Sequence, residues 1–358
     1  MRRRFCTLFA GVFVLIGLVP GAQATGVVSP VSPVPILDQA HGREFYAYAP
    51  SVIRQGEKEW IWTCQNSQEG QIVDDIRLDL LESGVVTQSQ VALTASAGSW
   101  DQFHICDPSV IRVNARLAGV DYRYAMFYLG NDRDASAHNE VGVAYAKNLS
   151  GPWVKNPIPV VSFDSTRDPS RWGVGQPSAT TIDPELGTAL LFWVENYAGP
   201  DQETKVYRMP LDLNEDSGVV AGEPKIVTTE GLKGSDGNAD WLNNADFAYD
   251  PPTDRFYVVR EQHPYPVGIP DWVGANLELV SIDGASIWSG GGAWRSEAII
   301  GPGQTGYPRN HNGGLVRTEY GTLPSTNRVD VMFSMSCVDC GDWLWSYRLR
   351  RVTVELDR

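Results

Sequence analysis

Hydrophobic residues follow the same pattern in five successive stretches of this chain, and each stretch predicts β-strands. Short apolar or alternating runs are separated by turns with glycine, proline, asparagine or aspartate, which is typical of antiparallel strands. The second run of each stretch is rich in aromatic and β-branched residues, a composition that suits a strand covered on both faces. These second strands are expected at residues 59–63, 124–129, 189–194, 255–259 and 330–335.

The first strands of these stretches recur at regular intervals. They begin near Pro50, Pro108, Pro177, Ala245 and Asn312, so the gaps are 58, 69, 68 and 67 residues. Regular spacing of this kind indicates a repeat architecture. No sustained helical periodicity follows the first 24 residues. The pattern therefore predicts an all-β fold, a five-bladed β-propeller of four-stranded antiparallel blades over residues 46–358. A β-sandwich is the fallback, because it needs shorter, non-repeating spacing between strands.

The N-terminal residues 1–24 have the pattern of a cleavable export signal. Three arginines at positions 2–4 precede an apolar run at 5–19, which is short for a membrane span, and small residues at 22–24 fit a cleavage site. We therefore expect a secreted or periplasmic protein without membrane insertion. Residues 25–45, rich in proline, valine and serine, predict a lead-in strand or tether.

An acidic composition limits the partners. The chain has 29 basic and 43 acidic residues, and without the export signal its net charge is −17, since the signal holds three arginines and no acidic residue. Nucleic acids and anionic membranes would repel such a surface, so neither is expected as a partner. A neutral substrate suits this charge better.

Four cysteines remain after the export signal and predict disulfides, because an even number in an exported protein favours pairing. Cys337 and Cys340 have CxxC spacing without a second CxxC, so a bridged loop is favoured over a zinc site. In the predicted propeller, Cys64 and Cys106 lie on one face of adjacent blades, a placement that allows a bridge between them.

The predicted topology gathers polar side chains at one mouth of the central channel. The inner strand of each blade lines the channel and the next strand runs antiparallel, so the start of one and the end of the other share a face. Polar groups that converge there form the default candidate site. This face collects Asp107, Gln176, Asn244, Asp246 and His311 from first strands, and Glu195, Arg260 and Glu261 from second strands.

The second stretch resembles a blade of the family 43 glycoside hydrolases and their five-bladed relatives, which include arabinanases, β-xylosidases and invertase-like enzymes. The resemblance rests on Asp-Pro-Ser-Val at 107–110, a tyrosine-rich second strand, Val-Gly-Val-Ala at 141–144 and the turn at 148–153. Residues 175–178 and 281–284 fit the same style. The resemblance implies hydrolysis of glycosidic bonds without a redox cofactor, with one carboxyl protonated to release the leaving sugar and another ionised to activate water.

The carboxyl groups depart from the family pattern in two blades. Ala49 stands where the family has its aspartate base, and Gln176 occupies the third blade, whereas Asp107 matches a family carboxylate. The resemblance then implies four catalytic candidates: Asp107 to orient or tune, Glu195 as the acid, and Asp246 or Glu261 as the base, with Asp74 and Asp75 in reserve. Glu195 ends a very apolar strand, where desolvation would raise its pKa as an acid requires.

Six further residues are expected to bind substrate: Gln176, Asn244, Arg260, His311, Trp172 and Trp241. For Arg260 a structural ion pair, and for His311 a hydrogen-bonded core role, remain open alternatives. The family places a histidine near the channel axis, in some members near a calcium, so a structural calcium there is the one metal that the resemblance implies. Because Ala49 and Gln176 are uncharged, a carbohydrate-binding propeller without catalysis is the second hypothesis. A protein-interaction scaffold, which would need an exposed apolar face, is the third.

Overall fold

The computed structural model describes residues 26–32, 35–37, 46–68, 72–133, 137–198, 204–340 and 346–357. The expected export signal at residues 1–24 lies outside this part of the chain, as does about half of the lead-in segment. In the part that is described, no helix is long and apolar enough to cross a membrane.

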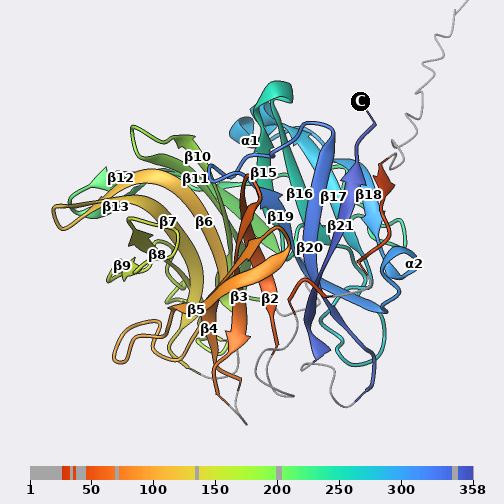
Figure 1. Cartoon of the computed structure of the whole chain (residues 1–358), viewed down its shortest axis with the longest axis horizontal. Helices are drawn as coiled ribbons and strands as arrows, with labels where there is room; N and C mark the ends of the chain where they lie inside the picture. The colour runs from red at the N-terminus through yellow and green to blue at the C-terminus, as the bar shows by residue number, and fades with distance from the viewer. Residues whose placement is uncertain are drawn as a thin grey trace, which may run out of the picture.

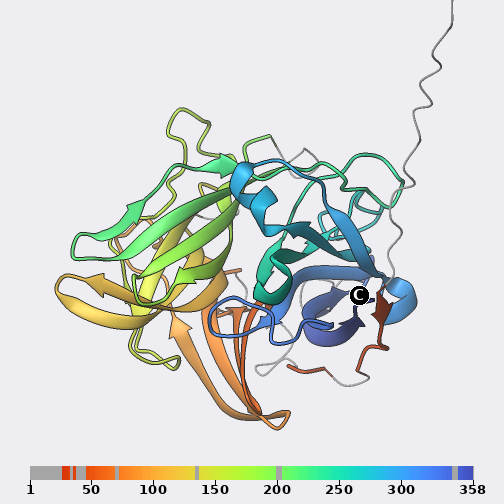
Figure 2. The same ribbon diagram turned by 90° about the horizontal axis from the view of Figure 1, so that it is seen from above.

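Strands dominate the structure and form five four-stranded antiparallel units around a common centre (Figures 1 and 2). Blade 1 consists of β2 (Tyr48–Gln55), β3 (Lys58–Asn66), β4 (Asp74–Glu82) and β5 (Val85–Leu93). Blade 2 consists of β6 (His104–Leu117), β7 (Val120–Asn131), β8 (Glu140–Ala146) and β9 (Val154–Lys155). Blade 3 consists of β10 (Gly173–Asp183), β11 (Thr188–Asn196), β12 (Lys205–Glu215) and β13 (Gly218–Ala221), with β14 (Lys225–Ile226) beside β12.

The last two blades follow the same plan. Blade 4 consists of β15 (Asp246–Asp250), β16 (Arg255–Glu261), β17 (Leu277–Asp283) and β18 (Arg295–Ile300). Blade 5 consists of β19 (Arg309–Arg317), β20 (Arg328–Ser336), β21 (Arg348–Glu355) and β1 (Val27–Val28). The helices that the structure describes are short: η1 (Pro251–Thr253), α1 (Gly284–Ser289) and α2 (Pro302–Thr305). The predicted all-β propeller is confirmed.

Blades 1 and 5 are joined in two ways. The inner strands β19 and β2 pair in parallel through Val316 and Val52, so both blades belong to one continuous sheet. The N-terminal strand β1 pairs antiparallel with β21 through Val28 and Val354. Figure 1 shows this red strand beside the blue C-terminal strands. The lead-in segment therefore supplies the outer strand of the last blade.

The hydrophobic core lies between neighbouring blades, as the apolar second strands predict. Along β11, Leu191 belongs to the cluster shared with blade 2, whereas Phe192 belongs to the cluster shared with blade 4. Phe192 stacks on Phe247 with ring centroids 3.9 Å apart. Because successive side chains of a strand point to opposite faces, each second strand fills two interblade cores at once.

Every inner strand turns at one residue with a left-handed backbone. We call these five residues the channel ring, and their φ angles lie between 44° and 49°: Ala49, Asp107, Gln176, Asn244 and Asn312. Strand register slips at this position in four blades, for example between Cys106 and Ser109. Such bulges re-aim a side chain, and left-handed non-glycine residues gather at functional sites. The repeat thus aims one side chain per blade at the channel.

Candidate functional site

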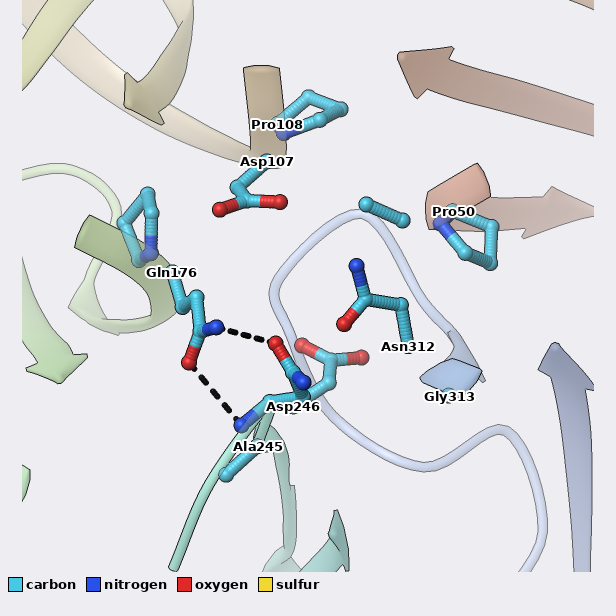
Figure 3. A pocket seen from close by; sticks show the side chains of 11 residues that line it. Pro50, Asp107, Pro108, Gln176, Ala245, Asp246, Asn312 and Gly313 are labelled. Carbon is cyan, nitrogen blue, oxygen red and sulfur yellow. Dashed lines mark hydrogen bonds between the residues drawn. The ribbon is translucent and has the colours of Figure 1, made fainter. Parts of the chain in front are cut away.

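The channel ring surrounds a narrow cavity of about 40 Å³. Its walls are completed by Pro50, Pro108, Pro177, Ala245, Asp246 and Gly313 (Figure 3). One water needs roughly 10–15 Å³ of such space, so the cavity holds a few waters and is too small for a sugar ring. A ligand larger than a few waters would therefore have to bind at the mouth, where the ring side chains meet the ends of the second strands.

Asp107 is the acidic member of the channel ring, and its carboxylate points into the cavity (Figure 3). Its backbone N–H donates to the sulfur of Cys64 at 2.9 Å, and Cys64 is bridged to Cys106, which immediately precedes Asp107. Burial raises the pKa of Asp107 to about 7; His311 opposes the rise and Asp74 adds to it. This carboxyl therefore keeps its proton in mildly acidic solution.

Both predicted disulfides are present, Cys64–Cys106 between blades 1 and 2 and Cys337–Cys340 within one loop. The interblade bridge packs against Leu129, with Ala49 and Trp172 partly buried beside it. The bridge therefore fixes the backbone on which Asp107 stands.

Glu261 forms a second polar centre at the end of β16. Its carboxylate is fully buried, and one oxygen, Oε1, accepts hydrogen bonds from His311 Nδ1 at 2.5 Å, Asn244 Nδ2 at 2.9 Å and the Asn312 backbone N–H at 3.1 Å. Burial alone would raise the pKa of Glu261, but His311 and the hydrogen bonds outweigh it and lower the pKa. An ionised carboxylate only accepts, so His311 Nδ1 carries the hydrogen. Among the residues described, His311 Nε2 has no hydrogen-bond partner, so Glu261 orients a histidine whose other nitrogen is free.

Asp246 also lines the cavity, and its carboxylate is held by groups of the channel wall. Its Oδ1 accepts from Ser178 Oγ at 2.7 Å and lies 3.2 Å from Arg317 Nη1, while its Oδ2 accepts from the Leu315 backbone at 2.8 Å. Both oxygens are therefore committed to the channel wall.

Arg317 fills the channel axis beneath the ring. This fully buried side chain donates to the hydroxyls of Ser51, Ser109 and Ser178 at 3.3–3.4 Å and so contacts blades 1, 2 and 3. Each of these serines also accepts a backbone N–H from the following blade. One guanidinium with Asp246 thus ties the inner strands together.

The expected axial calcium does not fit these residues. Calcium takes six to eight oxygen ligands, whereas Arg317 already supplies positive charge at the axis and Asp246 is bound to it. In the described part of the chain, one group of three potential ligands lies close together, Cys64, Asp74 and Cys106, and its two sulfurs are bonded to each other.

Chelation should therefore leave the protein unchanged. We expect EDTA to shift neither the melting temperature nor the circular dichroism spectrum, because the axial cation is a side chain. Elemental analysis of the purified protein provides the control. Calcium at one equivalent per chain, together with a lower melting temperature in EDTA, would contradict this assignment.

The remaining catalytic candidate, Glu195, is not brought to the cavity. It is half-buried at the end of β11, opposite Lys205 and 3.5 Å from the Tyr207 hydroxyl. Burial raises its pKa, as expected, while Lys205 lowers it. Arg260, expected to bind substrate, is fully buried and pairs with Asp240 and Glu278 at 2.5 Å each. The geometry is that of the structural ion pair.

Two of the other expected substrate contacts, Gln176 and Asn244, line the cavity. Gln176 and Asn244 join neighbouring blades through two hydrogen bonds between them (Figure 3). Trp172 is partly buried beside the interblade disulfide. Trp241 stacks on His263 with ring centroids 4.3 Å apart. The structure thus brings the amides of Gln176 and Asn244 to the cavity that Asp107 lines, and places Trp172 beside the neighbouring disulfide.

Solved structures resemble this chain, although no family model and no curated protein matches its sequence. A family 117 glycoside hydrolase of the marine bacterium Zobellia galactanivorans superposes with a TM-score of 0.63 at 10% identity, covering 93% of this chain and 91% of that one. A thermostable family 43 glycoside hydrolase gives 0.56 at 15% identity, covering 91% and 92%. The catalytic domain of the family 62 α-L-arabinofuranosidase from Coprinopsis cinerea gives 0.57 at 13%, covering 93% and 98%. The chain shares their fold.

Three residues of blades 1 and 2 that were not leading candidates from the sequence lie close to the channel ring: Tyr48, Asp74 and His104. Tyr48 immediately precedes Ala49, and its hydroxyl lies 2.6 Å from the buried carboxylate of Asp74. His104 accepts the Asp74 backbone N–H at 3.1 Å. The strand order alone could have indicated Asp74, because the third strand of a blade starts on the face where the second strand ends. In blade 1, Asn66 at the end of β3 pairs with Asp74 at the start of β4.

Proposed function

We propose that this protein is an exported glycoside hydrolase that cleaves a neutral poly- or oligosaccharide at the channel mouth. Asp107 is the proton donor, and His311, oriented by Glu261, is the proton acceptor. The observation that carries this proposal is the pairing, at one mouth, of a carboxyl whose pKa is about 7 with a histidine held by an ionised glutamate. The shared fold supports the reaction class, and Xanthomonas citri GH43_1, another structure of this fold, was solved with xylose.

The proposed chemistry is a single displacement. Protonated Asp107 gives its proton to the glycosidic oxygen as the bond to the anomeric carbon breaks. His311 Nε2 takes a proton from the water whose oxygen bonds to that carbon, and Glu261 stabilises the imidazolium that forms. Attack from the face opposite the leaving group inverts the anomeric configuration. Asp246, as the partner of Arg317, and Glu195, away from the cavity, have no chemical step.

In this proposal, aromatic and amide side chains bind the substrate. Trp172 and Trp241 offer rings for the apolar faces of sugars, and the amides of Gln176 and Asn244 can exchange hydrogen bonds with hydroxyls. The acidic surface favours a neutral carbohydrate, and the export signal predicted at residues 1–24 would bring the enzyme to extracellular polysaccharide.

A carbohydrate-binding propeller without catalysis is the second candidate. Four of the five ring positions, Ala49, Gln176, Asn244 and Asn312, are uncharged, so Asp107 supplies the one carboxylate of the channel ring. A binding protein would need the amide and aromatic contacts but not the raised pKa of Asp107.

A sugar-release screen separates the two candidates. The mature protein is incubated with arabinan, xylan, fructan and mixed bacterial polysaccharides, and reducing ends are measured while calorimetry records binding. Release of reducing sugar, with product of inverted configuration by NMR, supports the hydrolase. Binding without release identifies the second candidate, and retained configuration would contradict the single displacement.

The pH dependence of hydrolysis should follow the titration of the Asp107 carboxyl. Because the acid must be protonated and burial raises its pKa to about 7, kcat/KM is expected to fall above pH 7, by about tenfold per pH unit. The measurement is a pH profile of kcat/KM with a soluble oligosaccharide. A rate that keeps rising to pH 9 would mean that Asp107 acts in its ionised form.

A further inference from the structure

Blade 1 contributes no carboxylate to the channel ring, yet it holds a buried one close behind it. Ala49 occupies the ring, and the preceding residue, Tyr48, directs its hydroxyl to Asp74 Oδ2 at 2.6 Å. Tyr46 makes the equivalent bond to Asp74 Oδ1, also at 2.6 Å. The carboxylate of Asp74 is inaccessible to solvent. A single buried carboxyl therefore accepts hydrogen bonds from both phenols.

The two phenols differ in what they face. Tyr48 is half-buried, its ring lies nearly parallel to that of His311 at 6.2 Å, and its oxygen lies 3.1 Å from the sulfur of Cys106, the residue before Asp107. Tyr46 is 2% exposed and packs on Tyr48 and Tyr347. Of the two phenols, only Tyr48 therefore lies against both His311 and the residue before Asp107, and only Tyr48 keeps part of its side chain exposed.

We infer that Tyr48 is a specificity-determining residue of this site: its phenol oxygen accepts a hydrogen bond from a hydroxyl of the sugar ring that is cleaved, and Asp74 holds it in that role. This inference rests on the proposed function and names its substrate more closely. The enzyme requires a neutral sugar with a free hydroxyl donor on the side of blade 1.

The direction of this hydrogen bond follows from counting protons. A phenol has one proton, and the short contact commits that of Tyr48 to Asp74. Burial and Asp74 raise the pKa of Tyr48 well above its usual value, so the phenol stays neutral and is no nucleophile. The remaining lone pair of the oxygen can only accept. A sugar that lacks the matching hydroxyl would leave this polar atom unsatisfied, which is the situation in which sites discriminate strongly.

Two tyrosine variants test the inference as a matched pair. Tyr48→Phe and Tyr46→Phe each remove one hydroxyl and the hydrogen bond that it donates to Asp74, so both variants probe the same carboxyl. Tyr48→Phe is expected to lower kcat/KM by about 10- to 100-fold. Tyr46→Phe should stay within about threefold of wild type. Melting temperatures of both variants show whether the fold is intact.

A modified substrate provides the second arm. Monodeoxy aryl glycosides of the sugar found in the screen are compared in wild type and Tyr48→Phe. For one deoxy position the two proteins should have equal kcat/KM, because the lost hydroxyl and the lost phenol are partners. Equal losses in Tyr46→Phe and Tyr48→Phe, or a Tyr48→Phe penalty that persists on every deoxy substrate, would overturn the inference.

The outcome stays distinct from that of the proposed function. If wild type binds a polysaccharide without cleaving it, the hydrolase proposal fails, and the same variants are compared by calorimetry. Weaker binding by Tyr48→Phe alone would then uphold the contact, and unchanged binding would overturn it. A protein that neither cleaves nor binds any polysaccharide of the screen would contradict both.

Discussion

Asp107→Asn is expected to lower kcat for sugar release by about 10²- to 10⁴-fold, the usual contribution of a general acid. Asparagine keeps the shape of the side chain but has no proton to give to the leaving oxygen. The residue before it is bridged to Cys64, so the backbone position is preserved. Initial rates on the oligosaccharide found in the screen, measured at pH 6, provide the test.

The thermal stability of Asp107→Asn distinguishes a catalytic role of Asp107 from a structural one. A raised pKa means that the folded state prefers the protonated carboxyl, so the stability that Asp107 permits is full below its ordinary pKa of 3.8 and is lost as pH rises to about 7. At pH 8, Asp107→Asn should therefore melt no lower than wild type. A lower melting temperature together with the loss of activity would favour a structural role.

Glu195→Gln is the control for this experiment. The residue is acidic, has a raised pKa and ends the second strand of its blade, yet its neighbours are Lys205 and Tyr207. Its activity should stay within about threefold of wild type. A loss as large as that of Asp107→Asn would restore Glu195 as the proton donor.

Arg317→Met should destabilise the fold by about 3–5 kcal/mol, the cost of leaving one partner of a buried ion pair uncompensated. The variant leaves Asp246 without its cation and three serine hydroxyls of blades 1, 2 and 3 without a donor. The free energy of unfolding from urea denaturation measures the loss, and adding Asp246→Asn should recover part of it.

An exposed ion pair is the matched control. Arg116 pairs with Asp216 at 2.5 Å, and their side chains are 43% and 67% exposed. Solvent screens such a pair, so Arg116→Met should cost at most about 1 kcal/mol. If Arg317→Met were as mild as Arg116→Met, Arg317 would not be the cation that ties the blades together.

The order of strands in the blades could be predicted from the sequence because it repeats. The sheet face to which each side chain points could not, because it depends on the exact register of paired strands. In blade 4, Asp246 pairs with Val259, which places Glu261 two residues further on the same face. In blade 3, Ser178 pairs with Phe192, so the matching residue is Val194. Successive residues of a strand face opposite ways, so Glu195 points to the other side of its sheet.

The deeper part of the site was hidden for a different reason. Gln176, Asn244 and His311 were expected from their place at strand starts, and they do meet near Glu261. Arg317 stands at the far end of its strand, outside the stretch that the topology argument covered. Its length carries the guanidinium back to serines of three other blades, a reach that strand position alone does not convey.

The pairing of β1 with β21 has a consequence for how the chain reaches its final shape. Val27 meets Glu355, so this contact spans nearly the whole sequence. Contacts between distant residues form slowly, because the entropy of closing a long loop must be overcome first. Blade 5 cannot gain its outer strand β1 until residue 355 has left the ribosome. Until then the sheet of blade 5 ends at β21, whose outer edge has no strand to pair with.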